Sequence, residues 1–210
     1  MTKDNKIELM APAGNFTSLQ AALDNGADSV YFGVEQLNMR ARASINFTLN
    51  DLEEIAERCK AKNVRTYLTL NTIIYDHDLS VIKTLLDAAK KAKITAVIAM
   101  DQAVIAYARQ IGMEVHISTQ INVTNIETVK FYALFADTIV LSRELSLNQV
   151  KRITQQIEKE NITGPSGKLV EIEIFGHGAL CMAVSGKCYL SLHSHNSSAN
   201  RGACKKKKKK

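Results

Sequence analysis

The chain has 210 residues, 46% of them hydrophobic, which is enough to bury the core of one globular domain. Its formal net charge is +6, but the lysine run at residues 205–210 supplies all of that excess, so the rest of the chain is neutral. This composition excludes a strongly basic domain and a chain too polar to fold. Residues 1–204 are predicted to form one domain, followed by a disordered lysine tail at 205–210.

The amino-terminal stretch MTKDNKIELM does not resemble a signal peptide, because it lacks an apolar run of the required length. No later segment approaches the roughly 18 uninterrupted apolar residues that suggest a membrane span. We therefore expect a cytoplasmic protein without a membrane partner.

The first half of the chain alternates short apolar runs with amphipathic segments. Strands are predicted at residues 7–12, 28–33, 65–71 and 95–100, and helices at 16–24, 51–62 and 79–91. In the second helix, Leu52, Ile55, Ala56 and Cys59 share one apolar stripe, which predicts that Cys59 is a core residue. Asn50 is predicted to start that helix. The connection before it, residues 34–49, is long for a loop between strand and helix and carries Arg40 and Arg42.

The second half continues the same alternation. Strands are predicted at residues 114–119, 137–142 and 170–175, and helices at 102–111, 126–135 and 147–159, the last two starting after Asn125 and Ser146. Seven strands with helical crossovers predict an α/β fold with a parallel sheet, most simply a (β/α) barrel of the TIM type that lacks its eighth strand. An open doubly wound sheet is the alternative, although no G-x-G-x-x-G follows the first strand.

In a barrel, the residues that follow the strands converge on one face. The catalytic candidates there are Asn71, Gln120, Glu173 and His177, and the predicted binding residues for an anionic substrate group are Arg40, Arg42 and Arg143. Each has a structural alternative: Arg143 could pair with Glu144, and the two amides could satisfy loop backbone groups. His116 lies inside a strand and is predicted to be a core histidine. His193 and His195 are predicted to lie in a solvated loop.

Three cysteines, Cys181, Cys188 and Cys204, follow the last strand among glycines. The expected cytoplasmic location disfavours a disulfide, and the spacing lacks the C-x2-C of ordinary zinc sites. Thiolates on a flexible loop suit a soft metal or an iron-sulfur cluster, while a redox or nucleophilic cysteine is the alternative.

The stretch EIFGHGALCMAVSGKCYLS, residues 173–191, resembles the signature of peptidase family U32, the collagenase-like proteins. The signature E-x-F-x2-G-x2-C-x4-G-x-C-x-L-S is matched at every fixed position. Further segments resemble the family as well: LMAPAGN, GADSVYFG, RARASINF, HISTQINVTN, VLSRELS and SANRGAC. The resemblance extends from Ile7 to Cys204.

The resemblance implies two different activities. Some members are named proteases or collagenases. Others are O2-independent hydroxylases of tRNA bases, ribosomal RNA bases or the ubiquinone ring, with prephenate as oxygen donor in some cases and a 4Fe-4S cluster on four cysteines. By resemblance, Cys181, Cys188 and Cys204 match three of these ligands, and the fourth lies further along in the family. We therefore expect the amino-terminal part of a longer member.

Three hypotheses follow for function. The first is an iron-sulfur hydroxylase of an RNA base, with prephenate held by the arginines. The second is a peptidase acting on peptides, although no H-E-x-x-H or G-x-S-x-G is present and only a dyad of Cys181 and His177 is conceivable. The third is a fragment without catalytic activity.

Overall fold

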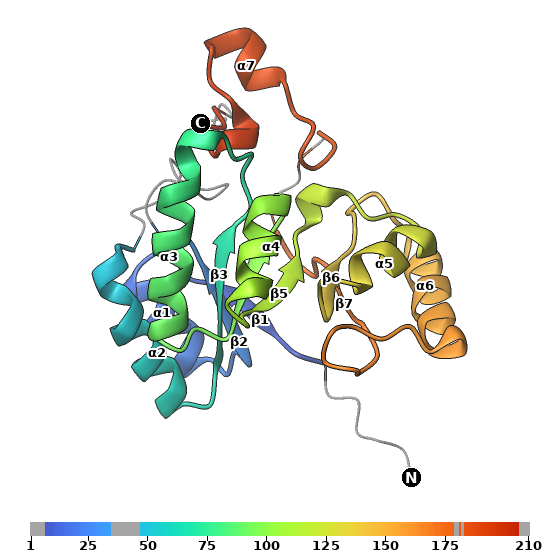
Figure 1. The fold of residues 1–210 in the computed structure, drawn as a ribbon, viewed down its shortest axis with the longest axis horizontal. Coiled ribbons are helices and arrows are strands. Elements are labelled where there is room, and N and C mark those ends of the chain that lie inside the picture. Colours follow the sequence, from blue (N-terminus) through green and yellow to red (C-terminus); the bar gives the residue numbers. More distant parts are fainter. Residues whose placement is uncertain (1–6, 35–46, 179–180, 182, 206–210) are drawn as a thin grey trace.

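The structure is a computed structural model that describes residues 7–34, 47–178, 181 and 183–205 (Figure 1). Arg40 and Arg42 lie outside this part of the chain, as do the lysines at 206–210. The predicted roles of the two arginines and the predicted disorder of the tail therefore stay predictions.

The core of the fold is one sheet of seven parallel strands that curls into a half-barrel (Figure 1). The strands are β1 (Met10–Pro12), β2 (Ser29–Phe32), β3 (Arg65–Leu70), β4 (Ala96–Ala99), β5 (Glu114–Ile117), β6 (Thr138–Val140) and β7 (Glu171–Glu173). Each strand pairs with its neighbour in the sequence, so the spatial order is the chain order. A doubly wound sheet reverses its order at a switch point, so that alternative was wrong, and the barrel-like prediction is confirmed. The described residues contain no eighth strand after β7.

Seven α-helices and four short 3-10 helices connect and follow the strands in the described residues. The α-helices are α1 (Phe16–Asp24), α2 (Leu52–Ala61), α3 (Leu79–Lys91), α4 (Gln102–Gln110), α5 (Ile126–Ala133), α6 (Leu147–Glu160) and α7 (Leu190–His195). The 3-10 helices are η1 (Leu49–Asp51), η2 (Asp76–Asp78), η3 (Thr119–Ile121) and η4 (Ala199–Arg201). In the part of the chain that the structure covers, no helix has the length and apolarity to cross a bilayer.

Local side chains explain where most helices begin. The Asn125 side chain accepts a hydrogen bond from the Thr128 amide at 2.9 Å, and Ser146 accepts from the Gln149 amide, so both predicted helix starts are confirmed. Asn50 was wrong as a cap, because it lies inside η1. Asp51 instead accepts from the Thr48 amide at 2.6 Å, and this contact closes the turn before α2.

The two faces of the sheet differ in chemistry. Alternate strand residues, such as Phe32, Leu68, Val97 and Ile139, are fully or almost fully buried in the layer between strands and helices, where Cys59 is also buried as predicted. The residues between them point to the inner face and include Tyr67, Thr69, His116, Thr138 and Glu173. The inner face of the half-barrel is therefore mixed, because an apolar cluster of Tyr67, Ala96 and Ile98 lies beside these polar side chains.

Candidate functional site

The carboxyl ends of the central strands are joined by polar side chains. Asn71 follows β3 and donates to the Ser118 hydroxyl, which follows β5, at 3.4 Å. Ser142 follows β6, and its hydroxyl oxygen lies 2.7 Å from the side-chain oxygen of Asn122. Gln120 lies between these pairs in η3, and its buried Oε1 has no hydrogen-bond partner within the described part of the chain. This face therefore presents a buried acceptor next to a built frame of amides and hydroxyls.

The residues that carry the three cysteines, Cys181 and 183–205, are here called the cysteine segment. Arg143, which follows β6, fixes its first half. The guanidinium donates to the Ser185 hydroxyl at 2.8 and 3.2 Å and to the Ala183 carbonyl at 3.3 Å. Glu144 instead accepts a hydrogen bond from Ser142, so the structure does not pair it with Arg143. Much of the hydrogen-bonding capacity of Arg143 is thus committed to the cysteine segment.

Gly186 brings the same half of the segment against the end of β5. A Cβ atom at this position would lie 2.2 Å from the Gln120 carbonyl oxygen, and the backbone has a φ of +72°. Only glycine combines that conformation with that close approach. The fixed glycine between Cys181 and Cys188 therefore has a physical reason.

The second half of the segment is fixed on the loop that follows β3. Arg201 donates to the Ile73 carbonyl at 2.8 Å and forms a salt bridge with Asp78 at 2.5 Å. Asn200 accepts at its backbone oxygen from the Ile73 amide at 3.2 Å and at its side chain from the Cys188 amide at 3.3 Å. Both halves of the cysteine segment are thus fixed at the carboxyl ends of strands.

The thiols differ in exposure. Cys59 is fully buried, and burial raises its pKa to about 11, so it is chemically inert at neutral pH. Cys181 and Cys188 are half-buried and Cys204 is exposed, and none of these described cysteines forms a disulfide. Three thiols on one anchored segment suit a soft metal. However, among the residues with described positions, no three His, Cys, Asp or Glu side chains are close enough to hold one ion. The thiols are the kind of ligand that an iron-sulfur cluster takes. In this structure, however, the three described thiols do not lie close enough together to bind one centre.

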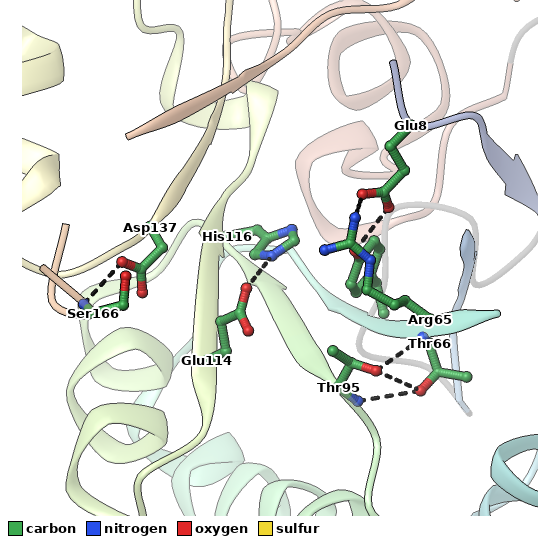
Figure 2. Close-up of polar contacts among 9 residues, drawn as sticks. Glu8, Arg65, Thr66, Thr95, Glu114, His116, Asp137 and Ser166 are labelled. Carbon is green, nitrogen blue, oxygen red and sulfur yellow. Dashed lines mark hydrogen bonds and ion pairs between the residues drawn. The ribbon is translucent and has the colours of Figure 1, made fainter. Parts of the chain in front are cut away.

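The inner face also carries a polar group that the sequence did not single out. Figure 2 shows Arg65 directed toward Glu8, with which it forms an ion pair, and His116 directed toward Glu114. The Tyr67 hydroxyl donates to Glu8 at 2.8 Å, and burial raises the pKa of Tyr67 to about 12. The alternation of Arg65, Tyr67 and Thr69 with Leu68 and Leu70 along β3 was the signal that could have revealed these polar side chains on the inner face.

His116 and Glu173 are the least satisfied members of this inner face. His116 is buried, as predicted, and its Nε2 lies 3.0 Å from Glu114 Oε1, while its Nδ1 has no partner among the described residues. Glu173 Oε2 is likewise buried without a described partner. Burial raises the pKa of Glu173, and the nearby charge of His116 opposes that rise.

The remaining histidines lie on the surface. His177 follows β7 and is exposed. His193 and His195 are also exposed, but they belong to α7, so the predicted loop there was wrong. In the described chain, His77 and His116 make side-chain polar contacts, and both pair with carboxylates rather than with a hydroxyl or thiol.

Comparison with known proteins agrees with this geometry. The family model of peptidase family U32 matches residues 14–210. A protein named collagenase from Porphyromonas gingivalis is 60% identical over 200 residues, which cover 95% of this chain and 48% of that protein. The tRNA hydroxylation protein P1 of Bacillus subtilis is 33% identical over 202 residues, covering 95% of this chain and 45% of that protein. The chain thus spans about half the length of these relatives.

A solved structure supports the fold. The U32 peptidase Mk0906 superposes with a TM-score of 0.60 at 15% sequence identity, over 83% of this chain and 70% of that one. At that identity the likeness concerns the barrel-like architecture alone.

Proposed function

This chain belongs to peptidase family U32, and from that we propose that the protein of which it forms at least a part is an iron-sulfur hydroxylase of an RNA base. The observation that carries the proposal is the cysteine segment, which Arg143 and Arg201 hold over the carboxyl ends of the strands. Active sites of barrel enzymes lie on that face. A relative named for tRNA hydroxylation aligns over 95% of the chain. A tRNA or ribosomal RNA substrate would also agree with the expected cytoplasmic location.

In this proposal, Cys181, Cys188 and Cys204 hold a 4Fe-4S cluster with a fourth ligand from elsewhere. The cluster would supply electron transfer or an open iron coordination position when bound. Thiolates with glycines nearby in the sequence suit that role. To bind one centre, the three thiols would have to move closer together than they lie in this structure.

The other residues of this face would bind and orient the reactants. Arg40 and Arg42 supply positive charge for an anionic oxygen donor such as prephenate, while Arg143 keeps the segment in place. Gln120 offers its buried Oε1 to a donor group of the substrate, and Asn71 fixes the neighbouring Ser118. Glu173, whose pKa burial raises, would hold or release a proton beneath them. The cysteine segment would lie above them, where Arg143 and Arg201 hold it over the strand ends.

A peptidase acting on collagen-like peptides is the second candidate, because the 60% identical relative carries the name collagenase. A cysteine mechanism would require a histidine beside Cys181 or Cys188. His177, the sequence-based candidate, is exposed. A fragment without activity is the third candidate.

Two assays separate the candidates. The chain, and a version extended to the length of its relatives, are purified without oxygen and analysed for iron, sulfide and visible absorbance. About four iron and four sulfide per extended chain support the cluster. Nucleosides from cells that lack the gene are then compared by mass spectrometry with complemented cells. Loss and recovery of a hydroxylated base supports the proposal. A metal-free extended protein that cleaves a collagen peptide would establish the peptidase instead.

A further inference from the structure

Arg201 makes the most extensive long-range contact of the cysteine segment. It lies 123 positions from Asp78 in the sequence, yet its Nη1 lies 2.5 Å from Asp78 Oδ2 and 2.8 Å from the Ile73 oxygen. Its guanidinium also lies over the Tyr75 ring, 4.9 Å from the centroid. These contacts, here called the Arg201 anchor, use the planar fork and the stacking face that distinguish arginine from lysine.

The Arg201 anchor differs from an ordinary surface ion pair. The Asp78 side chain is 11% exposed and also accepts from the Tyr75 amide at 3.0 Å. The hydrogen bond from Arg201 lowers the pKa of Asp78 despite the opposing effect of burial. Fully exposed pairs commonly contribute little, whereas this pair is screened less by water, because the Arg201 side chain is 27% exposed and that of Asp78 11%. The Arg201 anchor therefore holds the cysteine segment against the loop that follows β3.

Cys204 is tied closely to this anchor. After Arg201 the chain turns through Gly202, with a φ of +78°, and the Ala203 amide donates to the Ser198 carbonyl at 3.0 Å. Ser197 donates to the Ala203 carbonyl at 2.8 Å. On the other side of Cys204, the Lys205 amide donates to Ser191 at 3.0 Å. The backbone of Cys204 is thus bracketed by hydrogen bonds within the segment.

Cys188 is tied to the same anchor through Asn200. That residue is 4% exposed, its side chain accepts from the Cys188 amide at 3.3 Å, and its backbone oxygen accepts from the Ile73 amide at 3.2 Å. Cys188 therefore connects to the loop after β3 through one neighbour of Arg201. Arg143, by contrast, fixes residues Ala183 and Ser185 on the other side of Gly186.

We propose that Arg201 is a positioning residue that places Cys188 and Cys204 over the end of β3, with Asn200 transmitting its hold to Cys188. The biological role of Arg201, which is to assemble the cysteine site, rests on the proposed function. The physical part of the proposal concerns the segment alone and holds whether or not a cluster binds.

The test compares Arg201→Lys with Arg58→Lys. Both keep the charge, but the Arg58 partner is the exposed Glu54 on the same helix. Alkylation of each thiol is followed over time by mass spectrometry of the 210-residue chain. We expect Arg201→Lys to speed alkylation of half-buried Cys188 about tenfold. Cys188 reacts when the segment opens locally, and the loss of one charged hydrogen bond shifts that opening equilibrium by about this factor. Arg58→Lys should leave it unchanged.

Cys59 is the internal control for folding, because it is fully buried and its pKa is about 11. If Cys59 also reacts faster, Arg201 acts on the whole barrel and the proposal is wrong. It is equally wrong if Cys188 reacts at the same rate in both variants. Hydrogen exchange of residues 71–78 and 183–205 provides a second measurement, and both should exchange faster in Arg201→Lys.

Iron analysis of the extended protein then separates this inference from the proposed function. If the unmodified protein binds iron, Arg201→Lys should bind less than half as much. If the unmodified protein binds none, the hydroxylase proposal fails, while the alkylation result still decides the role of Arg201.

Discussion

Replacement of Gly186 by alanine tests whether close contact with the end of β5 holds the cysteine segment. The added Cβ would lie 2.2 Å from the Gln120 carbonyl oxygen and 3.1 Å from its carbonyl carbon. Backbone atoms on both sides leave no flexible side chain to give way, so the segment must move. Gly186 also has a φ of +72°, which costs a non-glycine residue about 1–2 kcal/mol.

A matched control separates these two costs. Gly26 has a φ of +79°, and a Cβ there would meet no described atom within 4 Å. Gly26→Ala should therefore lower the free energy of unfolding by about 1 kcal/mol, from backbone conformation alone. Gly186→Ala should lose that amount and also the hydrogen bonds from Arg143, about 1.5 kcal/mol for a charged donor at a partly buried site. We expect a total loss of about 2.5 kcal/mol.

Urea denaturation followed by circular dichroism measures both variants, and the comparison is valid while the slope against denaturant is unchanged. Thiol alkylation should also show Cys181 and Cys188 reacting faster in Gly186→Ala and not in Gly26→Ala. Equal stability losses in the two variants, with unchanged alkylation, would refute the argument from close approach.

Two further predictions concern buried groups. Cys59→Ser should lower the free energy of unfolding by about 1–3 kcal/mol relative to Cys59→Ala in urea denaturation, because it buries a hydroxyl without a partner; equal stabilities would contradict this. Burial raises the pKa of Glu173 above its unfolded value, so its ionisation destabilises the fold progressively as pH rises above about 4.5. Glu173→Gln should therefore be more stable than the unmodified chain at pH 7.5 and equal to it at pH 3.5, and a pH-independent difference would count against this origin.

The strands and helices were largely predictable from the sequence, because their signals are local. The alternation of apolar runs with amphipathic stripes located seven strands and six helices, and the caps at Asn125 and Ser146 follow from hydrogen bonds within three residues. The short helix α7 was missed because its sequence, LSLHSH, is polar and lacks a strong helical pattern. Its Ser191 accepts a hydrogen bond from Lys205, a contact that no local pattern encodes.

The candidate site was predictable only in outline. The glycines and cysteines after β7 marked the segment, and the strand ends marked the face. The hydrogen bonds of Arg143 were not predictable, because its partner Ser185 lies 42 positions away in the sequence. The same holds for Arg201 and Asp78, and for Glu8, which reaches Tyr67 across 59 positions.

The sequence by itself therefore determined the family resemblance, the order of the elements and the position of the thiols along the chain, because these depend on residue type and short-range spacing. The tertiary structure decided the register of the sheet, the contacts of the polar side chains on its inner face and which cations anchor the cysteine segment. Those features depend on which residues meet across turns of the barrel. An arginine can serve equally well to bind a ligand or to fix a loop, and only its neighbours in space determine which hydrogen bonds it makes.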